Sequence, residues 1–221
     1  MNAHLNPKYS AAYLLVFTLS SSKILSYIVL QEIAASKKKQ FLDIACGFGI
    51  WGKFIKKGSY ASYLVGLDIW KPYLMKIRGQ HIYDDLVLAD AAHLPFKERS
   101  FDVVIACEII EHLPTELGLS MLFHCERTAR EKVILSTPNY HYQQGPARGN
   151  PFEEHVSFWK DSDFKKAGYK VRGIGIKSAN GFAFSWIPLL GNFLGRVIMP
   201  ERFSHFAELI VGVKLKGETY S

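Results

Sequence analysis

The chain contains few cysteines and no pattern that would use them together. Cys46, Cys107 and Cys125 are the three cysteines in 221 residues, and none belongs to a Cys-x-x-Cys spacing. This number and spacing argue against both a disulfide framework and a thiolate zinc site. A reducing compartment fits best, and we expect a cytoplasmic protein.

Long apolar runs are also missing. The apolar stretch at residues 11–19 is about half as long as a bilayer-spanning helix requires, and no clear small-x-small cleavage motif follows it. We therefore expect no transmembrane segment and interpret residues 1–39 as N-terminal helices that pack on the domain.

Charge is sparse and scattered. Charged residues make up 21% of the chain and hydrophobic residues 48%, as in ordinary globular proteins. The net charge of +7 can attract nucleic acid or an anionic membrane surface, but the one basic run, residues 37–39, fits a solvated loop. We therefore expect neither as the main partner, and the sequence says nothing about oligomeric state.

Short apolar runs alternate with helical patterns from residue 41 onward, which is typical of βαβ units and a parallel sheet. The candidate strands are 41–45, 63–67, 86–89, 101–107, 132–136, 169–176 and 209–215. We predict one α/β domain over 1–221 with a doubly wound, seven-stranded, mostly parallel sheet whose last strand is antiparallel. Residues 40–176 form the ligand-binding core in this prediction, and residues 207–216 form the final strand.

Residues 177–206 form an apolar insertion before that strand. Side chains such as Trp186 and Phe193 are too apolar for a solvated loop, so the segment either caps the ligand cleft or covers the sheet. Contact with a membrane surface is a third, weaker interpretation.

A glycine-rich turn follows the first strand in the sequence LDIACGFGIWG. Gly47, Gly49 and Gly52 match G-x-G-x-x-G, a weak pattern by itself, which lets a backbone approach a nucleotide-like ligand. Asp68 ends the second strand, where a carboxylate can accept hydrogen bonds from both ribose hydroxyls.

Two further carboxylates argue against a dinucleotide. Asp43, inside the first strand, would repel a pyrophosphate but complements an ammonium group. Asp90, just after the third strand, can accept a hydrogen bond from an adenine amino group. The ligand is therefore expected not to be a dinucleotide.

Four segments in this order, LDIACGFG, GLDIW, ADAAHLPF and FDVVIACEIIEHL, resemble the class I S-adenosylmethionine-dependent methyltransferases, most closely the methyltransferase type 11 group. The resemblance covers roughly residues 40–175. It implies a Rossmann-like fold, S-adenosylmethionine as cofactor and methyl transfer as the reaction.

The resemblance also implies a role for each matching residue. Asp43 and the loop of Ala45, Cys46, Gly47 and Gly49 would hold the methionine part. Asp68 would bind ribose, Ile69 would cover one face of adenine, and Asp90 with the backbone of Ala91 would read its edge. Glu108 would lie near the sulfonium. Ala45 replaces the first motif glycine, and we expect it to keep a negative φ, which alanine adopts readily.

The sequence leaves the acceptor open. If the acceptor is a hydroxyl or a protonated amine, His112 and His155 are the candidate general bases. Metal ligands could come from the residues Glu111, His112, His141, His155, Glu153 and Glu154. No fixed spacing such as His-x-x-x-His supports a metal, so we predict none.

A small-molecule acceptor is our main prediction. The alternatives are a non-catalytic protein that binds S-adenosylmethionine, an RNA methyltransferase suggested by the net charge, and a nicotinamide-dependent oxidoreductase suggested by the glycine spacing.

Overall fold

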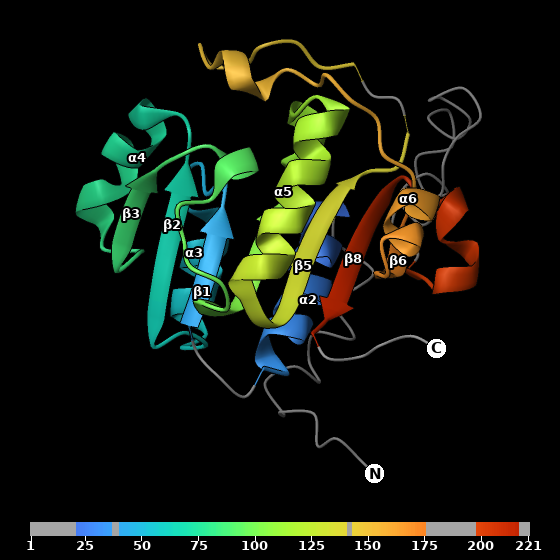
Figure 1. Cartoon of the computed structure of the whole chain (residues 1–221), viewed down its shortest axis with the longest axis horizontal. Coiled ribbons are helices and arrows are strands. Elements are labelled where there is room, and N and C mark those ends of the chain that lie inside the picture. The colour runs from blue at the N-terminus through green and yellow to red at the C-terminus, as the bar shows by residue number, and fades with distance from the viewer. Residues whose placement is uncertain (1–20, 37–39, 141–142, 176–197, 217–221) are drawn as a thin grey trace.

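The computed structural model describes residues 21–36, 40–140, 143–175 and 198–216. They form one eight-stranded sheet with the order β3-β2-β1-β4-β5-β8-β6-β7 (Figure 1). The strands are β1 Gln40–Ile44, β2 Tyr63–Asp68, β3 Asp85–Leu88, β4 Phe101–Cys107, β5 Ala129–Pro138, β6 Lys170–Ile174, β7 Ile198–Met199 and β8 Leu209–Leu215.

Strands β1 to β5 are parallel, and β8 lies antiparallel between β5 and β6. The predicted doubly wound sheet with an antiparallel last strand is confirmed. The two-residue strand β7 is an addition to the seven predicted strands, and it pairs with β6 at the edge of the sheet.

Helices cover both faces of the sheet. Helices α2 (Ser21–Ala34), α3 (Ile50–Lys57) and α4 (Lys71–Ile77) contribute buried residues to a core on one face. Helices α5 (Thr115–Thr128) and α6 (Asp161–Lys166) do the same on the other. Figure 1 shows α5 in front of the sheet and α2 and α3 behind it. Helix α2 presents Ile24, Ile28 and Val29 to the core, so this part of residues 1–39 is a packed helix.

Five short 3₁₀ helices connect these elements: η3 Arg78–Gln80, η4 Ala91–His93, η5 Ile110–His112, η6 Pro151–Glu153 and η7 Glu201–Phe206. Helices η4 and η5 follow the carboxyl ends of β3 and β4, and η6 lies in the loop after β5. This loop crosses over that edge of the sheet toward α4 (Figure 1). There, Phe152 packs on Trp70 and Tyr73 hydrogen-bonds Glu153.

The apolar residues on which the cap interpretation rests, Phe182 to Leu194, lie outside the described residues. The described end of the 177–206 segment contains β7 and η7, and β7 extends the sheet at the edge farthest from β3. Asn139 holds η7 in place because its Nδ2 donates to the carbonyl oxygens of Ser204 and Ala207, each at 3.0 Å. Among the helices of the described ranges, none is long and apolar enough to cross a membrane.

Candidate active site

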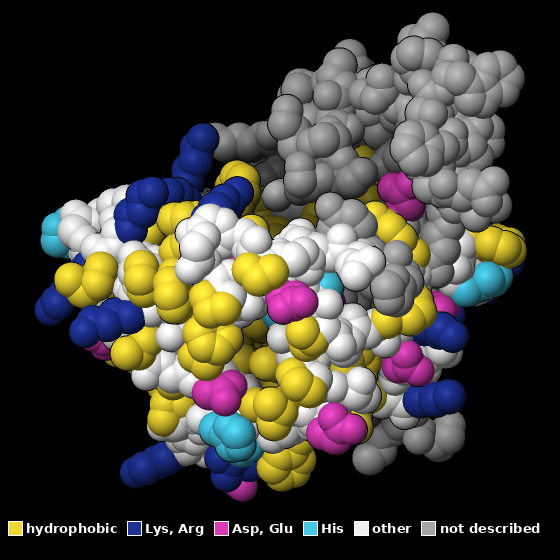
Figure 2. Space-filling model, turned by 90° about the horizontal axis from the view of Figure 1, so that it is seen from above, with side chains coloured by type: hydrophobic (Ala, Val, Ile, Leu, Met, Phe, Trp, Pro, Cys, Tyr) yellow, Lys and Arg dark blue, Asp and Glu magenta, His cyan; other side chains and the backbone are white. Residues whose placement is uncertain are grey.

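A cavity opens at the carboxyl ends of the parallel strands, near the point where strand order reverses between β1 and β4. It contains about 350 Å³ of atom-free space including its mouth, and its wall consists of Ala45, Leu67, Ile69, Asp90, Ala91, Ile109, His112, Leu113 and Phe152. Figure 2 looks down on this end of the molecule, where hydrophobic side chains gather across the described surface. Open α/β sheets bind ligands at this position.

The glycine turn after β1 is held by Asp68 at the end of β2. The Gly47 N–H donates to Oδ2 of Asp68 and the Trp70 N–H donates to Oδ1, both at 2.8 Å. Gly47 and Gly49 have φ values of 51° and 73°, in the left-handed region that glycine adopts without strain. Burial raises the pKa of Asp68, and the two backbone donors oppose that rise. Each carboxylate oxygen keeps a second lone pair for a ribose hydroxyl.

Ala45 also has a positive φ, of 54°. The expectation of a negative φ was therefore wrong, because the turn requires a left-handed conformation at the residue that follows β1. Glu108, which follows β4 across the switch point, has the same φ of 54°. Non-glycine residues in this region carry strain, and such strain clusters at functional sites.

Asp43 is fully buried in β1, beneath the glycine turn. Its Oδ2 accepts a hydrogen bond of 2.5 Å from the Tyr83 hydroxyl. Its Oδ1 is buried and has no hydrogen-bond partner among the described residues. Burial raises the pKa of Asp43 to about 7, against the opposing effect of Tyr83. An unpartnered buried carboxylate oxygen at this place fits an ammonium-bearing ligand.

Two residues of the glycine motif have structural tasks. A Cβ on Gly52 would lie 2.4 Å from the Tyr83 ring, so this glycine allows α3 to pack close to Tyr83. The Cys46 side chain is buried in the hydrophobic core, while its N–H donates to the Leu67 carbonyl at 2.9 Å. Burial raises the pKa of the Cys46 thiol, which remains protonated. The structure thus directs the Cys46 side chain away from the cavity.

Asp90, Ala91 and Ile69 lie together in the cavity wall. Asp90 caps η4, because its Oδ1 accepts from the Ala92 N–H at 2.8 Å, and its Oδ2 lies 3.2 Å from Nδ1 of His93. Ile69 is 38% exposed, which leaves its side chain available to cover a flat ring.

Two glutamates lie at the end of β4. Solvent reaches part of Glu108. Partial desolvation of its carboxyl group raises its pKa to about 7, against a hydrogen bond of 2.7 Å from Ser136. Glu111 is 3% exposed and accepts a hydrogen bond of 2.9 Å from Thr137. Burial, and then repulsion by Glu108, raise the pKa of Glu111 well above its usual range.

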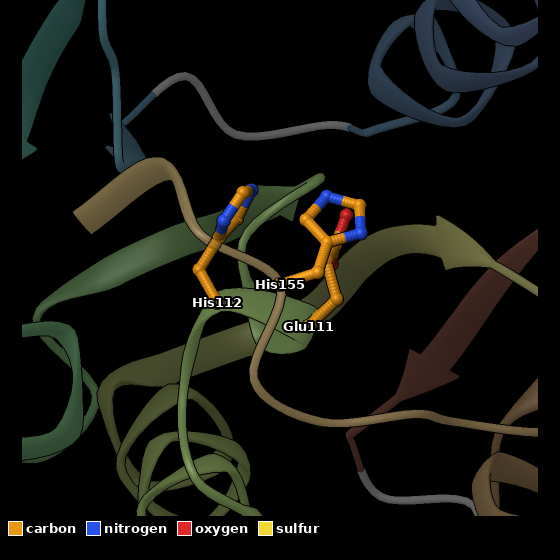
Figure 3. A group of neighbouring side chains, drawn as sticks. All are labelled: Glu111, His112 and His155. Atoms are coloured by element: carbon orange, nitrogen blue, oxygen red, sulfur yellow. The ribbon is translucent and has the colours of Figure 1, made fainter. Parts of the chain in front are cut away.

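The two predicted bases are neighbours. The rings of His112 and His155 stand edge to face with centroids 4.7 Å apart, and His112 reaches the cavity wall. Burial lowers the pKa of His112. Figure 3 shows both imidazoles beside the Glu111 carboxylate, and donor atoms of the three residues all lie within 4.8 Å of one another. His141 lies outside the described residues.

Sequence reasoning missed four wall residues, Leu67, Ile109, Leu113 and Phe152, and it missed Tyr83. The apolar wall residues look like ordinary core positions in the sequence. Phe152 had a weak signal, because it is an aromatic residue in the loop after β5 from which acceptor contacts were expected.

Comparison with known proteins supports the inference from this geometry. Residues 42–136 match the model of a methyltransferase domain family. A phthiotriol/phenolphthiotriol dimycocerosates methyltransferase of Mycobacterium tuberculosis is 27% identical over 197 residues, which cover 82% of this chain and 68% of that protein. A demethylmenaquinone methyltransferase of Lactiplantibacillus plantarum is 29% identical over 114 residues, 48% of each chain.

The fold is similar to that of a SAM-dependent methyltransferase from Archaeoglobus fulgidus, with a TM-score of 0.55 and 15% identity. The match covers 94% of this chain and all of that one. The match over residues 42–136 and the shared fold are consistent with a class I S-adenosylmethionine-dependent methyltransferase. The chain is a methyltransferase with S-adenosylmethionine as its cofactor, and the nicotinamide interpretation of the glycine spacing is wrong.

Proposed function

We propose that the protein methylates a small molecule that enters the cavity from the side of His112. The observation that supports this most strongly is the composition of the cavity wall, where Ala45, Ile69, Asp90 and Ala91 meet His112 and Phe152. The first four are expected contacts of the cofactor, Ala45 with its methionine part and Ile69, Asp90 and Ala91 with its adenine. The last two belong to η5 and to the loop after β5, which place an acceptor opposite the cofactor.

The proposed roles follow the geometry. Asp68 binds the ribose, Asp90 and Ala91 bind the adenine edge, and Ile69 covers the ring. Asp43 and the loop of residues 45–49 hold the methionine part, with Cys46 acting through its backbone. Glu108 lies on the methionine side of the cavity. His112 and His155 position the acceptor or remove its proton.

When bound, S-adenosylmethionine supplies an already activated methyl group, so the protein has mainly to align the acceptor and exclude water. Seven of the nine wall residues are apolar and serve the exclusion of water. They also favour a small acceptor with an apolar body. The two relatives described above are named for phthiotriol dimycocerosates and for demethylmenaquinone, neither of which is a nucleic acid.

Isothermal titration with S-adenosylhomocysteine tests the cofactor site. We expect Asp68→Asn to weaken binding by about 1 to 3 kcal/mol, because charge-assisted hydrogen bonds to the ribose are lost. Asp90→Asn should weaken it less, since an adenine amino group is a single neutral donor. Asp85→Asn, at the opposite end of the sheet, is the matched control and should bind normally.

If Asp68→Asn binds S-adenosylhomocysteine as tightly as the wild type, Asp68 does not bind the ribose. If the wild type does not bind it, the cofactor assignment is wrong. Methyl-labelled cofactor, incubated with small hydroxyl and amine compounds and separately with RNA, then tests the acceptor. Label that appears in RNA alone contradicts the proposal.

A further inference from the structure

The side chains of Glu111, His112 and His155 come from two segments far apart in the sequence. Glu111 and His112 lie in η5 after β4, and His155 lies in the loop after η6 (Figure 3). Their donor atoms fall within 4.8 Å of one another. We propose that these three residues bind a divalent first-row transition-metal ion, such as zinc, cobalt or manganese, at the acceptor side of the cavity.

The donor set suits such an ion. Two imidazoles and one carboxylate are the ligands of many catalytic zinc sites, which keep a further position open for water or substrate. Neighbouring donors in a tetrahedral shell lie about 3.4 Å apart at the usual zinc bond lengths. The donor atoms lie within 4.8 Å of one another, so a closer approach of the three side chains is needed to reach that spacing.

The backbone already joins the two segments. The N–H groups of Val156 and Ser157 both donate to the Glu111 carbonyl oxygen, at 3.0 and 3.1 Å. The His155 N–H donates to the Gln144 carbonyl at 2.9 Å. The ligands are therefore positioned before any ion arrives, which lowers the cost of ordering them.

Hydrogen bonds to neighbouring groups orient two of the three ligands, His112 and Glu111, as is usual in metal sites. Nδ1 of His112 lies 3.1 Å from the Glu154 carbonyl oxygen, which can only accept a hydrogen bond. Nδ1 must then carry the proton, and Nε2 keeps its lone pair for an ion. Thr137 donates to Oε2 of Glu111 at 2.9 Å, which fixes this carboxylate while leaving other lone pairs available.

Charge also favours a cation here. Glu111 is buried beside Glu108, and the ion pairs found within the described ranges place no Lys or Arg on either carboxylate. A buried carboxylate without a cationic partner, as at Glu111, is costly to keep away from water, and the neighbouring Glu108 adds repulsion. A divalent ion beside Glu111 would offset both effects.

The site has a consequence for the acceptor, which rests on the proposed function. A hydroxyl oxygen bound to the ion loses its proton more easily, because the metal stabilises the oxyanion. The proton passes to solvent, an oxygen lone pair forms the O–CH₃ bond, and the electron pair of the broken C–S bond returns to sulfur. The acceptor class is therefore a hydroxyl compound.

Metal binding is tested without an acceptor. Metal is first removed from tag-free protein with a chelator. The protein is then titrated with Co²⁺, and binding is measured by the visible absorption of the ion and by the heat of binding. Zn²⁺ or Mn²⁺ is added afterwards as a competitor. We expect one ion per chain, and at least about tenfold weaker binding in His155→Ala and Glu111→Gln. His81→Asn, an exposed histidine remote from the cavity, is the matched control and should bind like the wild type.

Equal Co²⁺ affinity in wild type, His155→Ala and Glu111→Gln would overturn the site, as would absence of binding in the wild type. Titration with S-adenosylhomocysteine runs in parallel, so loss of cofactor binding marks a failure of the proposed function instead. If a hydroxyl acceptor is found and its methylation rate is the same with and without the ion, the role in activating the acceptor is wrong.

Discussion

At the scale of single residues, the site depends on backbone conformations that its side chains do not favour. Ala45 and Glu108 both adopt φ of 54° on opposite sides of the switch point. A left-handed conformation costs a non-glycine residue about 1 to 2 kcal/mol. The surrounding sheet and turns hold both residues in this conformation, so interactions elsewhere in the fold offset the strain energy.

Replacing Ala45 with glycine should therefore stabilise the protein. Relief of the left-handed strain outweighs the greater entropy of glycine in the unfolded chain, and we expect a gain of about 1 kcal/mol in the free energy of unfolding. Urea denaturation measures it. Ala167→Gly is the control, because Ala167 has φ of −78° and should lose about 0.5 to 1 kcal/mol. Equal losses in both variants would contradict the strain at Ala45.

At the scale of elements, the sequence predicted best those strands that are mostly apolar. The candidate strands 101–107 and 209–215 match the observed strands to the residue, since each is a mostly apolar run bounded by polar residues. Strand β5 begins three residues earlier than predicted. Its start contains Arg130 and Glu131, whose charges argue against a strand. Arg130 pairs with Asp102 at 2.9 Å, and Ser36 donates to Glu131, contacts between distant segments that no local pattern shows.

The same limit applies to the site. Residues of the cofactor half follow strands directly, so motif order placed Asp68, Asp90 and Ala91 in the region of the cavity. The meeting of Glu111 and His112 with His155 depends on the path of the loop after β5, which no spacing encodes. The positive φ of Ala45 was equally hidden, because alanine normally indicates a negative φ.

The loop after β5 is anchored to α5 through Trp159. This side chain is buried, and its indole N–H donates to the Ile110 carbonyl and to Ser157. A Cβ on Gly118 of α5 would lie 2.5 Å from the Trp159 ring. The absence of a side chain at Gly118 therefore permits the contact between helix and loop.

Gly118→Ala should displace Trp159. We expect a loss of about 1 kcal/mol in unfolding free energy, because the cost of overpacking exceeds the gain in helix propensity. Near-ultraviolet circular dichroism should change with it, as Trp159 moves. Gly79→Ala is the control, since no atom lies within 4 Å of the added Cβ. If both variants keep the wild-type spectrum and stability, Trp159 does not anchor the loop.

At the scale of the whole molecule, the carboxyl edge of the sheet collects acidic groups whose pKa burial raises. Asp43, Asp68, Glu108 and Glu111 all belong to this set. An acid whose pKa is higher in the folded state than in the unfolded chain keeps its proton longer when folded. Folding is then favoured at low pH, and this contribution is lost as the pH rises. The cofactor edge is thus expected to be less stable in mildly alkaline solution than in mildly acidic solution.

Asp43→Asn isolates one group of this set. The ordinary pKa of 3.8 rises to about 7 in the folded protein, so the Asp43 contribution is fully present below about pH 4 and lost by about pH 7. This difference corresponds to a loss on the order of 4 kcal/mol in the wild type. Asparagine keeps an oxygen to accept from Tyr83 but cannot ionise. Asp68, Cys46 and Tyr83, which face Asp43, remain in the variant.

Urea denaturation of both proteins at pH 5 and pH 8, without cofactor, measures the effect. Between pH 5 and pH 8, we expect the unfolding free energy of the variant to fall less than that of the wild type, because asparagine cannot ionise. It still falls in the variant, because Asp68, Glu108 and Glu111 titrate in both proteins. Cofactor binding should show the opposite preference in the wild type. The ionised Asp43 attracts the ammonium group of S-adenosylhomocysteine, so affinity should rise from pH 6 to pH 8, and less so in Asp43→Asn. Parallel stability curves for the two proteins would show that Asp43 is already ionised in the folded protein at pH 5.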